Sequence, residues 1–360
     1  MRLRPEARDH IALELRFQSD ACARLGSALY SSLMARAAQN AQAGGIIAEL
    51  LEPYVAKPRG AAVALRLFGS VHLLALKGLV PELARWYPSC GGTTRSHPDT
   101  VWQAFAEACE VHREAVAEGL THPPQTNEPG RGAALRGGME LTAERTGLPL
   151  RLNEIGASAG LNLRADLFRV GTPEGFRGPA DSPVLIPGAW VGNTPPSAAL
   201  TICERRGCDL EPISPVDDAA ALRLQSYVWP DQQARFERLR GALELARAVP
   251  ADVAAQSAEQ FLAGLEPEIG CVTVIQHSVM WQYLPDSVRA ACTRELARLR
   301  AAATSAAPVA HIALEPRRVR DDTDVDYHGF EFTVTWACWP YQEEHIVAYA
   351  SPHGPPIHWE

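Results

Sequence analysis

This 360-residue sequence has few features of a metal centre or of a disulfide framework. Its eight cysteines form no C-x-x-C pair, and its eleven histidines form no H-E-x-x-H pattern. Both patterns are typical of zinc sites, so the sequence predicts no bound metal. Scattered cysteines without a pairing pattern are typical of free thiols in a reducing compartment. We therefore expect a cytoplasmic protein.

The N-terminal segment and the charge balance argue against two further classes. Residues 1–20 carry acids and bases throughout and lack the apolar core of a secretory signal peptide. The most apolar helical stretch, residues 61–80, contains Arg66, His72 and Lys77, which a membrane span would rarely hold. A net charge of -8 offers no attraction to nucleic acid or anionic lipid. We expect a small-molecule substrate, no nucleic-acid partner and no membrane partner, and the sequence indicates no particular oligomeric state.

The chain divides into two parts by its hydrophobic pattern. Before residue 148, apolar residues recur at helical spacing between glycine and proline breaks, as in the stripe formed by Ile11, Leu15, Cys22, Leu25, Leu29 and Leu33. We predict an all-helical bundle or cap domain over residues 1–147. Residues 148–360 then form an α/β domain, with a loop insertion near residues 170–198 that is rich in glycine and proline.

Short β-rich runs alternate with helical patterns in this second part. The predicted strands are 150–155, 199–203, 251–255, 271–276, 309–314, 330–336 and 345–350, with helices over 230–248 and 287–302 between them. Alternation of strands and helices predicts a mostly parallel sheet that carries helices on its faces. The last two strands are too close in sequence for a helical crossover and must form an antiparallel hairpin.

The segment LRLNEIGASAGLNL, residues 150–163, is open to two interpretations. GASAG matches the G-x-S-x-G elbow that presents the serine nucleophile of an α/β-hydrolase, here Ser158. The same residues also resemble a strand that runs into a loop of small residues, against which a nucleotide-like ligand can lie. A hydrolase elbow follows several earlier strands, whereas everything upstream of this segment is helical, so the order of elements favours the second interpretation.

With its strands, helices and closing hairpin in this order, the second part resembles a class I S-adenosylmethionine-dependent methyltransferase with a Rossmann-like sheet. The loop is similar to the first motif of that fold, with Ser158 in the place of a glycine. The resemblance implies that Glu154 holds the amino group of the methionine moiety and that Gly156 and Gly160 let the cofactor approach. Asn162, just after the loop, is assigned to the same site. The alternative for the glycines is a plain tight turn.

Two acids after later strands complete the implied cofactor site. In this fold an acid at the end of the second strand accepts both ribose hydroxyls, which places Asp209 there, with Glu204 as the second choice. Asp209 lies 49 residues after Gly160 (209 minus 160), a gap that the insertion can explain. Near the third strand Ser257 holds the expected acidic position, and Glu259 is the candidate adenine contact or an exposed helix residue.

The stretch QHSVMWQYLPDSVR, residues 276–289, resembles the methyltransferase segment that follows strand four. His277 is a candidate general base because the pKa of a histidine lies near neutral pH. Trp281 and Tyr283 are candidates for walls of the acceptor pocket, or else buried aromatics at the start of a helix. Glu315, at the end of the fifth strand, is the second catalytic candidate because it faces the same carboxyl-end crevice.

A polar turn, QTNEPGR, precedes the last helix of the first part. Its residues Asn127, Glu128 and Arg131 carry side chains capable of directed hydrogen bonds, and an arginine fork suits a carboxylate. They are candidate substrate contacts. Alternatively, Asn127 simply caps the following helix.

Five motifs in order, QTNEPGR, NEIGASAGLNL, ERRGCDLEPI, YVWPDQ and QHSVMWQYLP, resemble the bacterial domain-of-unknown-function 2332 family over nearly the full length. That resemblance implies no activity. Three hypotheses therefore stand: methyl transfer to a small molecule, a methyltransferase-like fold repurposed for another ligand or reaction, and an esterase that uses Ser158.

Overall fold

The computed structural model describes residues 4–95, 97–318 and 330–360. The chain divides into two compact units, and each unit is made of two separate segments of the sequence. Residues 1–126 with 217–237 form the first unit, and residues 127–216 with 238–360 form the second. No helix of the described residues combines the length and the apolar character needed to cross a bilayer.

The first unit is helical throughout its described residues. Its helices are α1 (Pro5–Arg24), α2 (Ala28–Gln42), α3 (Ile46–Leu51), α4 (Val63–Leu76), α5 (Pro81–Ala84), α6 (Pro98–Val111), α7 (Arg113–Leu120) and α9 (Asp218–Ser226). The predicted stripe along α1 and α2 is confirmed in outline, since Ile11, Leu15, Cys22 and Leu33 are buried in one hydrophobic core. Asp231 closes the turn between these two helices by accepting hydrogen bonds from Ser27 Oγ and the Leu29 amide.

The second unit is organised by a nine-stranded sheet among its described residues, in the order β5-β12-β11-β10-β9-β8-β1-β6-β7. The strands are β1 (Leu150–Ile155), β5 (Trp190–Gly192), β6 (Ile202–Asp209), β7 (Asp252–Ala255), β8 (Val272–Ser278), β9 (Val309–Arg318), β10 (Phe330–Trp339), β11 (Gln342–Ser351) and β12 (Gly354–Trp359). The five strands β7-β6-β1-β8-β9 are parallel, and β10 and β11 form the predicted antiparallel hairpin. A mixed α/β fold with a mostly parallel sheet is thus confirmed.

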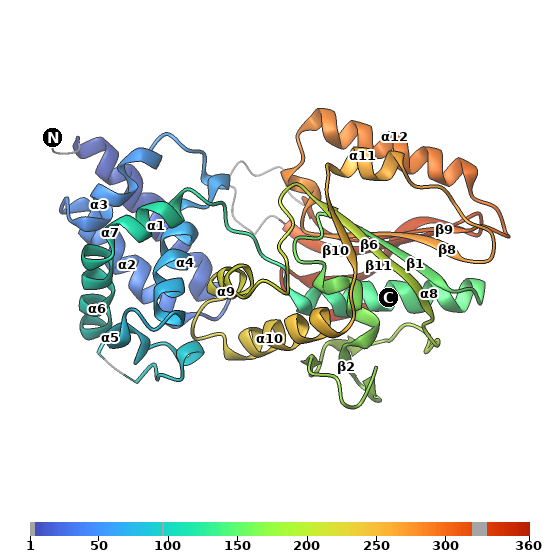
Figure 1. The fold of residues 1–360 in the computed structure, drawn as a ribbon, viewed down its shortest axis with the longest axis horizontal. Helices are drawn as coiled ribbons and strands as arrows, with labels where there is room; N and C mark the ends of the chain where they lie inside the picture. The colour runs from blue at the N-terminus through green and yellow to red at the C-terminus, as the bar shows by residue number, and fades with distance from the viewer. Residues whose placement is uncertain (1–3, 96, 319–329) are drawn as a thin grey trace. The chain divides into compact units, whose positions relative to one another are not determined.

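Helices cover both faces of this sheet. α11 (Ala258–Ala263) and α12 (Asp286–Ala302) lie on one face, and α8 (Gly132–Thr146) lies on the other (Figure 1). α8 packs very closely, because a Cβ on Gly137 would meet the ring of Trp359 and one on Gly138 would meet Ile312. Trp336 Nε1 of β10 also donates to Thr142 Oγ1 of α8. The remaining long helix, α10 (Gln233–Ala248), runs across the division between the units.

The division between the units differs from the boundary predicted at residue 147. The second unit begins at Asn127, so that α8 belongs with the sheet, and residues 217–237 return to the helical unit. α8 is buried along most of its length, including Arg136 and Glu140, which pair with each other at 2.9 Å. Helical periodicity identifies such a helix but does not indicate which core it packs against.

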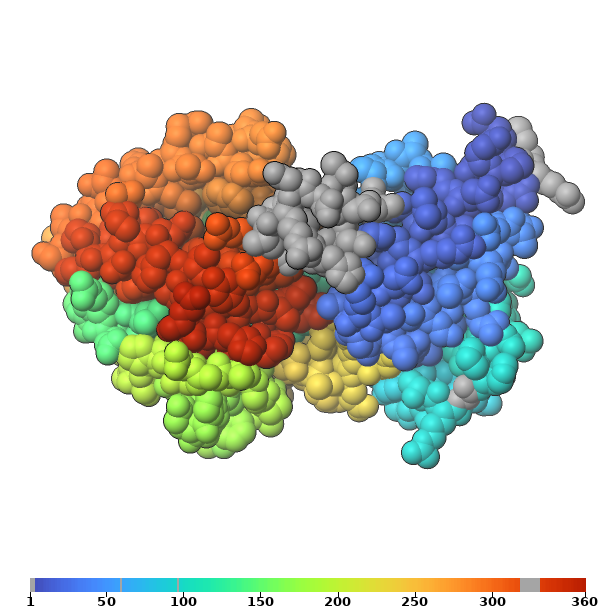
Figure 2. Space-filling view, turned by 180° about the vertical axis from the view of Figure 1, so that it is seen from behind, coloured from blue at the N-terminus to red at the C-terminus, as the bar shows by residue number. Residues whose placement is uncertain are grey.

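The insertion that we expected to be a loop contains strands, and so does the tail after residue 350, where we predicted none. The insertion holds a small sheet of β3 (Gly175–Arg177), β2 (Arg169–Thr172) and β4 (Leu185–Ile186), followed by β5. It protrudes below the C-terminal strands in the view from behind (Figure 2). The tail forms β12, which pairs with both β11 and β5. Their glycine and proline content indicated turns, and strands this short produce no periodic signal.

Candidate functional site

The loop after β1 lies at the point where the strand order reverses. Numbered by their order along the chain, the five parallel strands run 3-2-1-4-5, so that β1 is followed on one side by β6 and on the other by β8. Ligands of open α/β sheets bind at the carboxyl ends of the strands beside such a switch point. The residues 156–160 occupy that position.

Three residues of this loop have a left-handed backbone. The φ angles are +66° at Gly156, +52° at Ser158 and +64° at Gly160. A Cβ on Gly156 would lie 2.9 Å from the side chain of Met280, and one on Gly160 would lie 2.8 Å from Val253. Both glycines are therefore required by the turn itself as well as by close neighbours. The short 3-10 helix η5 (Leu161–Leu167), kinked at Arg164, follows the loop.

Asp209 holds the loop from the neighbouring strand. β6 begins later than predicted and extends to Asp209, which is therefore its last residue. One carboxylate oxygen of Asp209 accepts the Ser158 amide at 2.9 Å, and the other accepts the Glu211 amide at 3.0 Å. Asp209 therefore ties the end of β6 to the loop after β1.

Glu154 is an acid buried at the end of β1. Its side chain accepts from Gln276 Nε2 of β8 at 3.2 Å, and its exposed fraction is 1%. Burial raises the pKa of Glu154 to about 8, against the smaller lowering effects of the Gln276 hydrogen bond and the charge of Arg164. The carboxyl group is therefore mostly protonated at neutral pH, and a cation placed beside it would favour its ionised form.

Several buried polar atoms near Glu154 have no hydrogen-bond partner among the described residues. They are Ser158 Oγ, Asn162 Oδ1 and Gln276 Oε1. Gln276 Nε2 also approaches the Asn162 carbonyl at 3.4 Å, which brings these two residues to the same place as Glu154. Buried acceptors are normally satisfied, so this group is suited to a ligand that donates hydrogen bonds.

The polar turn before α8 contacts the same loop. Asn127 Oδ1 accepts the Leu161 amide at 2.8 Å, and the Glu128 side chain accepts the Gly130 amide at 2.9 Å. Arg131 Nε donates to the Pro352 carbonyl at 3.0 Å, in the turn before β12. Asn127 thus ties the turn to the loop and does not cap α8, and these contacts alone give all three residues a part in holding the fold.

The two catalytic candidates, His277 and Glu315, lie on the opposite face of the sheet from Glu154. Gln276 pairs with Glu154 across β1 and β8, and neighbouring residues of a strand point to opposite faces. His277 and Glu315 line a cavity of about 420 Å³ beside α12. This volume lies in the ordinary range for a small-molecule site. The other lining residues are Trp281, Thr293, Leu296, Ala297, Arg300, His311, Ala313, Thr335, Trp339, Glu343 and Glu344.

Glu315 is held from three directions. One of its oxygens accepts from His277 Nδ1 at 2.8 Å, from the Met280 amide at 3.0 Å and from the Trp281 amide at 3.3 Å. The loop 279–281 therefore folds over β9 at Glu315, which lies inside the strand and not at its end as predicted, and Val279 is in a left-handed conformation at φ +53°. The ring of Trp281 stacks on that of His277, with centroids 5.2 Å apart.

Two further predicted residues, Tyr283 and Glu259, belong neither to the group around Glu154 nor to the group around His277. Tyr283 is 67% exposed and is not among the residues that line the cavity, whereas Trp281 is. Glu259 stands in the first turn of α11, after β7, and its Oε2 is buried without a partner among the described residues. Glu259 is therefore a half-buried residue and not a fully exposed one.

His311 and Glu344 extend the His277 group and were not among the predicted residues. His277 Nε2 lies 3.1 Å from His311 Nε2, and His311 Nδ1 lies 2.9 Å from Glu344. Burial lowers the pKa of His311, and the hydrogen bond from His311 lowers the pKa of Glu344. The available signal was a histidine inside the apolar run VAHIAL. Its partner is set by strand register, which the sequence does not specify.

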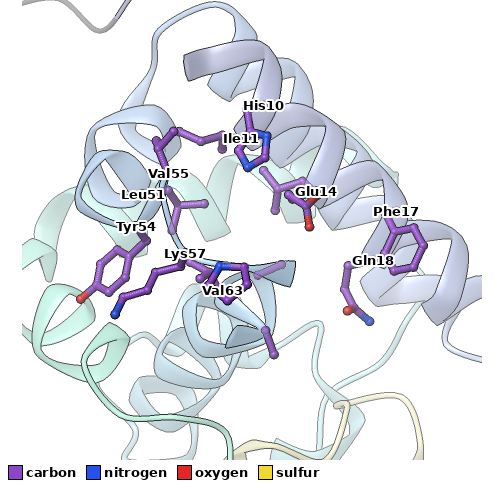
Figure 3. A pocket seen from close by; sticks show the side chains of 14 residues that line it. His10, Ile11, Glu14, Phe17, Gln18, Leu51, Tyr54, Val55, Lys57 and Val63 are labelled. Atoms are coloured by element: carbon purple, nitrogen blue, oxygen red, sulfur yellow. The ribbon is translucent and has the colours of Figure 1, made fainter. Parts of the chain in front are cut away.

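A second cavity lies in the helical unit, between α1 and the start of α4 (Figure 3). Its lining is mostly apolar, with His10, Glu14 and Lys57 among its polar residues. The cavity holds about 50 Å³, which is room for a few water molecules and far below the size of a metabolite site. The candidate site is therefore in the second unit.

The chain matches the model of the family described as "Uncharacterized protein conserved in bacteria (DUF2332)" over residues 12–359. The chain belongs to this family. The five motifs that suggested it lie in the turn before α8, the loop after β1, the last part of β6, the segment before α10 and the segment after β8. No curated protein and no solved structure matches the chain. Membership of the family assigns no reaction, so function has to be inferred from the site.

Proposed function

We propose that this protein transfers a methyl group from S-adenosylmethionine to a small-molecule acceptor, on a Rossmann-like sheet. The observation that supports the proposal most is the position of the loop Gly156–Gly160 at the switch point of a 3-2-1-4-5 sheet, directly after the buried acid Glu154. Nucleotide-like ligands of such sheets lie against this loop.

The residues present suit the methionine end of this cofactor. An ammonium group donates three hydrogen bonds and carries a positive charge. Gln276 Oε1 is a buried acceptor without a partner in the described structure, and Glu154 is a buried carboxyl group hydrogen-bonded to the same side chain. Binding of an ammonium group would satisfy these acceptors and offset the burial of the Glu154 charge. The polar chemistry therefore fits the group.

The ribose and adenine contacts are extensions of the same proposal. Asp209 would accept the ribose hydroxyls while it continues to hold the Ser158 amide. Glu259 Oε2, which lacks a partner among the described residues, would accept from the adenine amino group. The Met280 side chain lies against Gly156, and this flexible side chain would have to yield to the ligand.

The bound cofactor would supply an electrophilic methyl group on a sulfonium centre. The residues of the chain would position the acceptor and take up its proton. His277, Glu315 and Trp281 line the cavity on the other face of the sheet from Glu154, so this reaction is not assigned to them.

Calorimetric titration with S-adenosylmethionine and with its demethylated product tests the proposal. We expect micromolar binding by the wild type and none by Gly156→Val, which introduces a side chain at the ligand face of the loop. Gly147→Val is the matched control, because Gly147 has the same φ of +66° and no atom within 4 Å of its Cβ position. Absence of binding by folded wild-type protein would contradict the proposal and favour a repurposed crevice.

One observation favours a second candidate, an esterase that uses Ser158. A serine with a left-handed backbone after a buried strand is typical of a nucleophile elbow, and φ is +52° here. However, Ser158 Oγ has no hydrogen-bond partner among the described residues, whereas a nucleophile needs a base within reach. A fluorophosphonate probe separates the two. Labelling that disappears in Ser158→Ala would support the esterase.

A further inference from the structure

Four side chains form a continuous hydrogen-bonded row on the α12 face of the sheet. Glu315 and His311 come from β9, His277 comes from β8 and Glu344 comes from β11. The successive distances are 2.8 Å from Glu315 to His277, 3.1 Å between the two Nε2 atoms and 2.9 Å from His311 to Glu344. All three are hydrogen-bond lengths.

The number of protons in this row follows from its geometry. Each of the three contacts needs one proton, because a carboxylate oxygen and a bare imidazole nitrogen both only accept. Two neutral imidazoles carry two protons between them. The row therefore holds one proton more than its neutral histidines supply. That proton can reside on His277, on His311 or on either glutamate with every contact still satisfied.

The two ends of the row lie in different surroundings. The Glu315 side chain is 17% exposed, and its Oε2 atom is buried without a partner among the described residues. The Glu344 side chain is 48% exposed. The end of the row at Glu344 is therefore open to solvent, and the end at Glu315 is largely enclosed.

We infer that Glu315, His277, His311 and Glu344 form a proton relay between solvent and the inner end of this cavity. In one transfer, Glu344 gives its proton to His311 Nδ1, His311 Nε2 gives its proton to His277 Nε2, and His277 Nδ1 gives its proton to Glu315. Three bonds to hydrogen break and three form. The net result is one proton moved from Glu344 to Glu315, and the reverse sequence returns it to solvent.

This inference goes beyond the proposed function and does not depend on which ligand binds at Glu154. Glu315 is the group that meets a ligand in the cavity, while His311 and Glu344 act through His277 and are positioning residues. The other charged groups that line the cavity, Arg300 and Glu343, pair with each other at 2.7 Å. Glu343 is therefore a charged neighbour of the row that takes no part in it.

The test is NMR of protein labelled with ¹⁵N in its histidines, which distinguishes bare from protonated ring nitrogens. In the wild type we expect the ring-nitrogen signals of His277 and His311 to be coupled through the row. Glu344→Gln removes the outer carboxylate and should shift the ¹⁵N signal of His277 Nε2, although the two residues do not touch. Glu343→Gln, the matched control, should leave that signal unchanged.

His311→Gln separates a relay from a direct effect of charge. A glutamine at this position can hydrogen-bond to His277 but cannot pass on a proton. In the His311→Gln background, the relay predicts that most of the effect of Glu344→Gln on His277 is lost, whereas an effect through space alone would persist at its full size. The inference is overturned if the full effect persists, or if Glu344→Gln and Glu343→Gln affect His277 equally. The comparison of the two exposed glutamates stands even if His311→Gln does not fold.

Discussion

Replacing Glu154 with glutamine is expected to stabilise the fold at neutral pH while it removes the ionisable partner of a bound ammonium group. In the folded protein the pKa of Glu154 is raised from 4.5 to about 8, chiefly by burial. Folding at pH 7 therefore requires a carboxylate that is ionised in the unfolded chain to take up a proton. Each difference of one in pKa corresponds to about 1.4 kcal/mol.

The sign and size of the effect follow from linkage. Below pH 4.5 the carboxyl group is protonated in both states and contributes nothing to the pH dependence. Between pH 4.5 and pH 8 the folded state binds more protons than the unfolded state, so the free energy of unfolding falls as pH rises. This requirement to protonate Glu154 on folding is a penalty on stability of under about 1 kcal/mol at pH 5 and roughly 3 kcal/mol at pH 7. Glu154→Gln is free of this penalty and keeps an acceptor for Gln276.

Urea unfolding at pH 5 and at pH 7 measures the difference. We expect Glu154→Gln to exceed the wild type in stability by roughly 3 kcal/mol at pH 7 and by much less at pH 5. Glu204→Gln is the control, because Glu204 stands on the neighbouring strand β6 with a 38% exposed side chain in an ion pair with Arg151. It should change stability by less than about 1 kcal/mol at either pH. A Glu154→Gln protein that is less stable than the wild type at pH 7 would refute the reasoning.

Two further predictions concern packing and the loop. Gly137→Ala should destabilise the second unit by about 2 kcal/mol, because the new methyl group would overlap the Trp359 ring. The control Gly264→Ala, whose nearest contact would be an ordinary 3.5 Å, should have little effect, and equal urea-unfolding midpoints for the two would contradict the packing of β12 on α8. Asp209→Ala should weaken binding of S-adenosylmethionine by at least about tenfold, since a lost hydrogen bond to a charged group is worth about 1.5–3 kcal/mol. Unchanged affinity in the titration would remove Asp209 from the site.

The sequence predicted the parts of the fold that have a strong periodic signal. The buried strands β1, β8 and β9 and the hairpin of β10 and β11 lie close to their predicted ranges, since apolar runs between turns are unambiguous. The loop after β1 could also be located, because a left-handed turn needs small residues such as Gly156 and Gly160. The sequence could not predict that α8 packs with the sheet and not with the helical unit, because the β12 residues that α8 contacts lie more than 200 positions later in the chain.

The sequence predicted several residues of the candidate site, but it did not predict which of them lie together. Glu154 and His277 were both expected in one crevice, but the pairing of Glu154 with Gln276 directs them to opposite faces of the sheet. Gln276 itself was overlooked, because an isolated polar residue in an apolar strand has no pattern. The row from Glu315 to Glu344 depends on the register of β8, β9 and β11, which only the folded sheet sets.

The most direct measurement on the central claim is the number of protons released when S-adenosylmethionine binds at pH 7, obtained by calorimetry in buffers of different ionisation enthalpy. Free Glu154 is mostly protonated at that pH, and an ammonium group beside it would drive its ionisation. We therefore predict the release of nearly one proton per bound ligand by the wild type and of none by Glu154→Gln. Binding without proton release, or no binding by the folded wild type, would contradict the assignment of Glu154 to the cofactor.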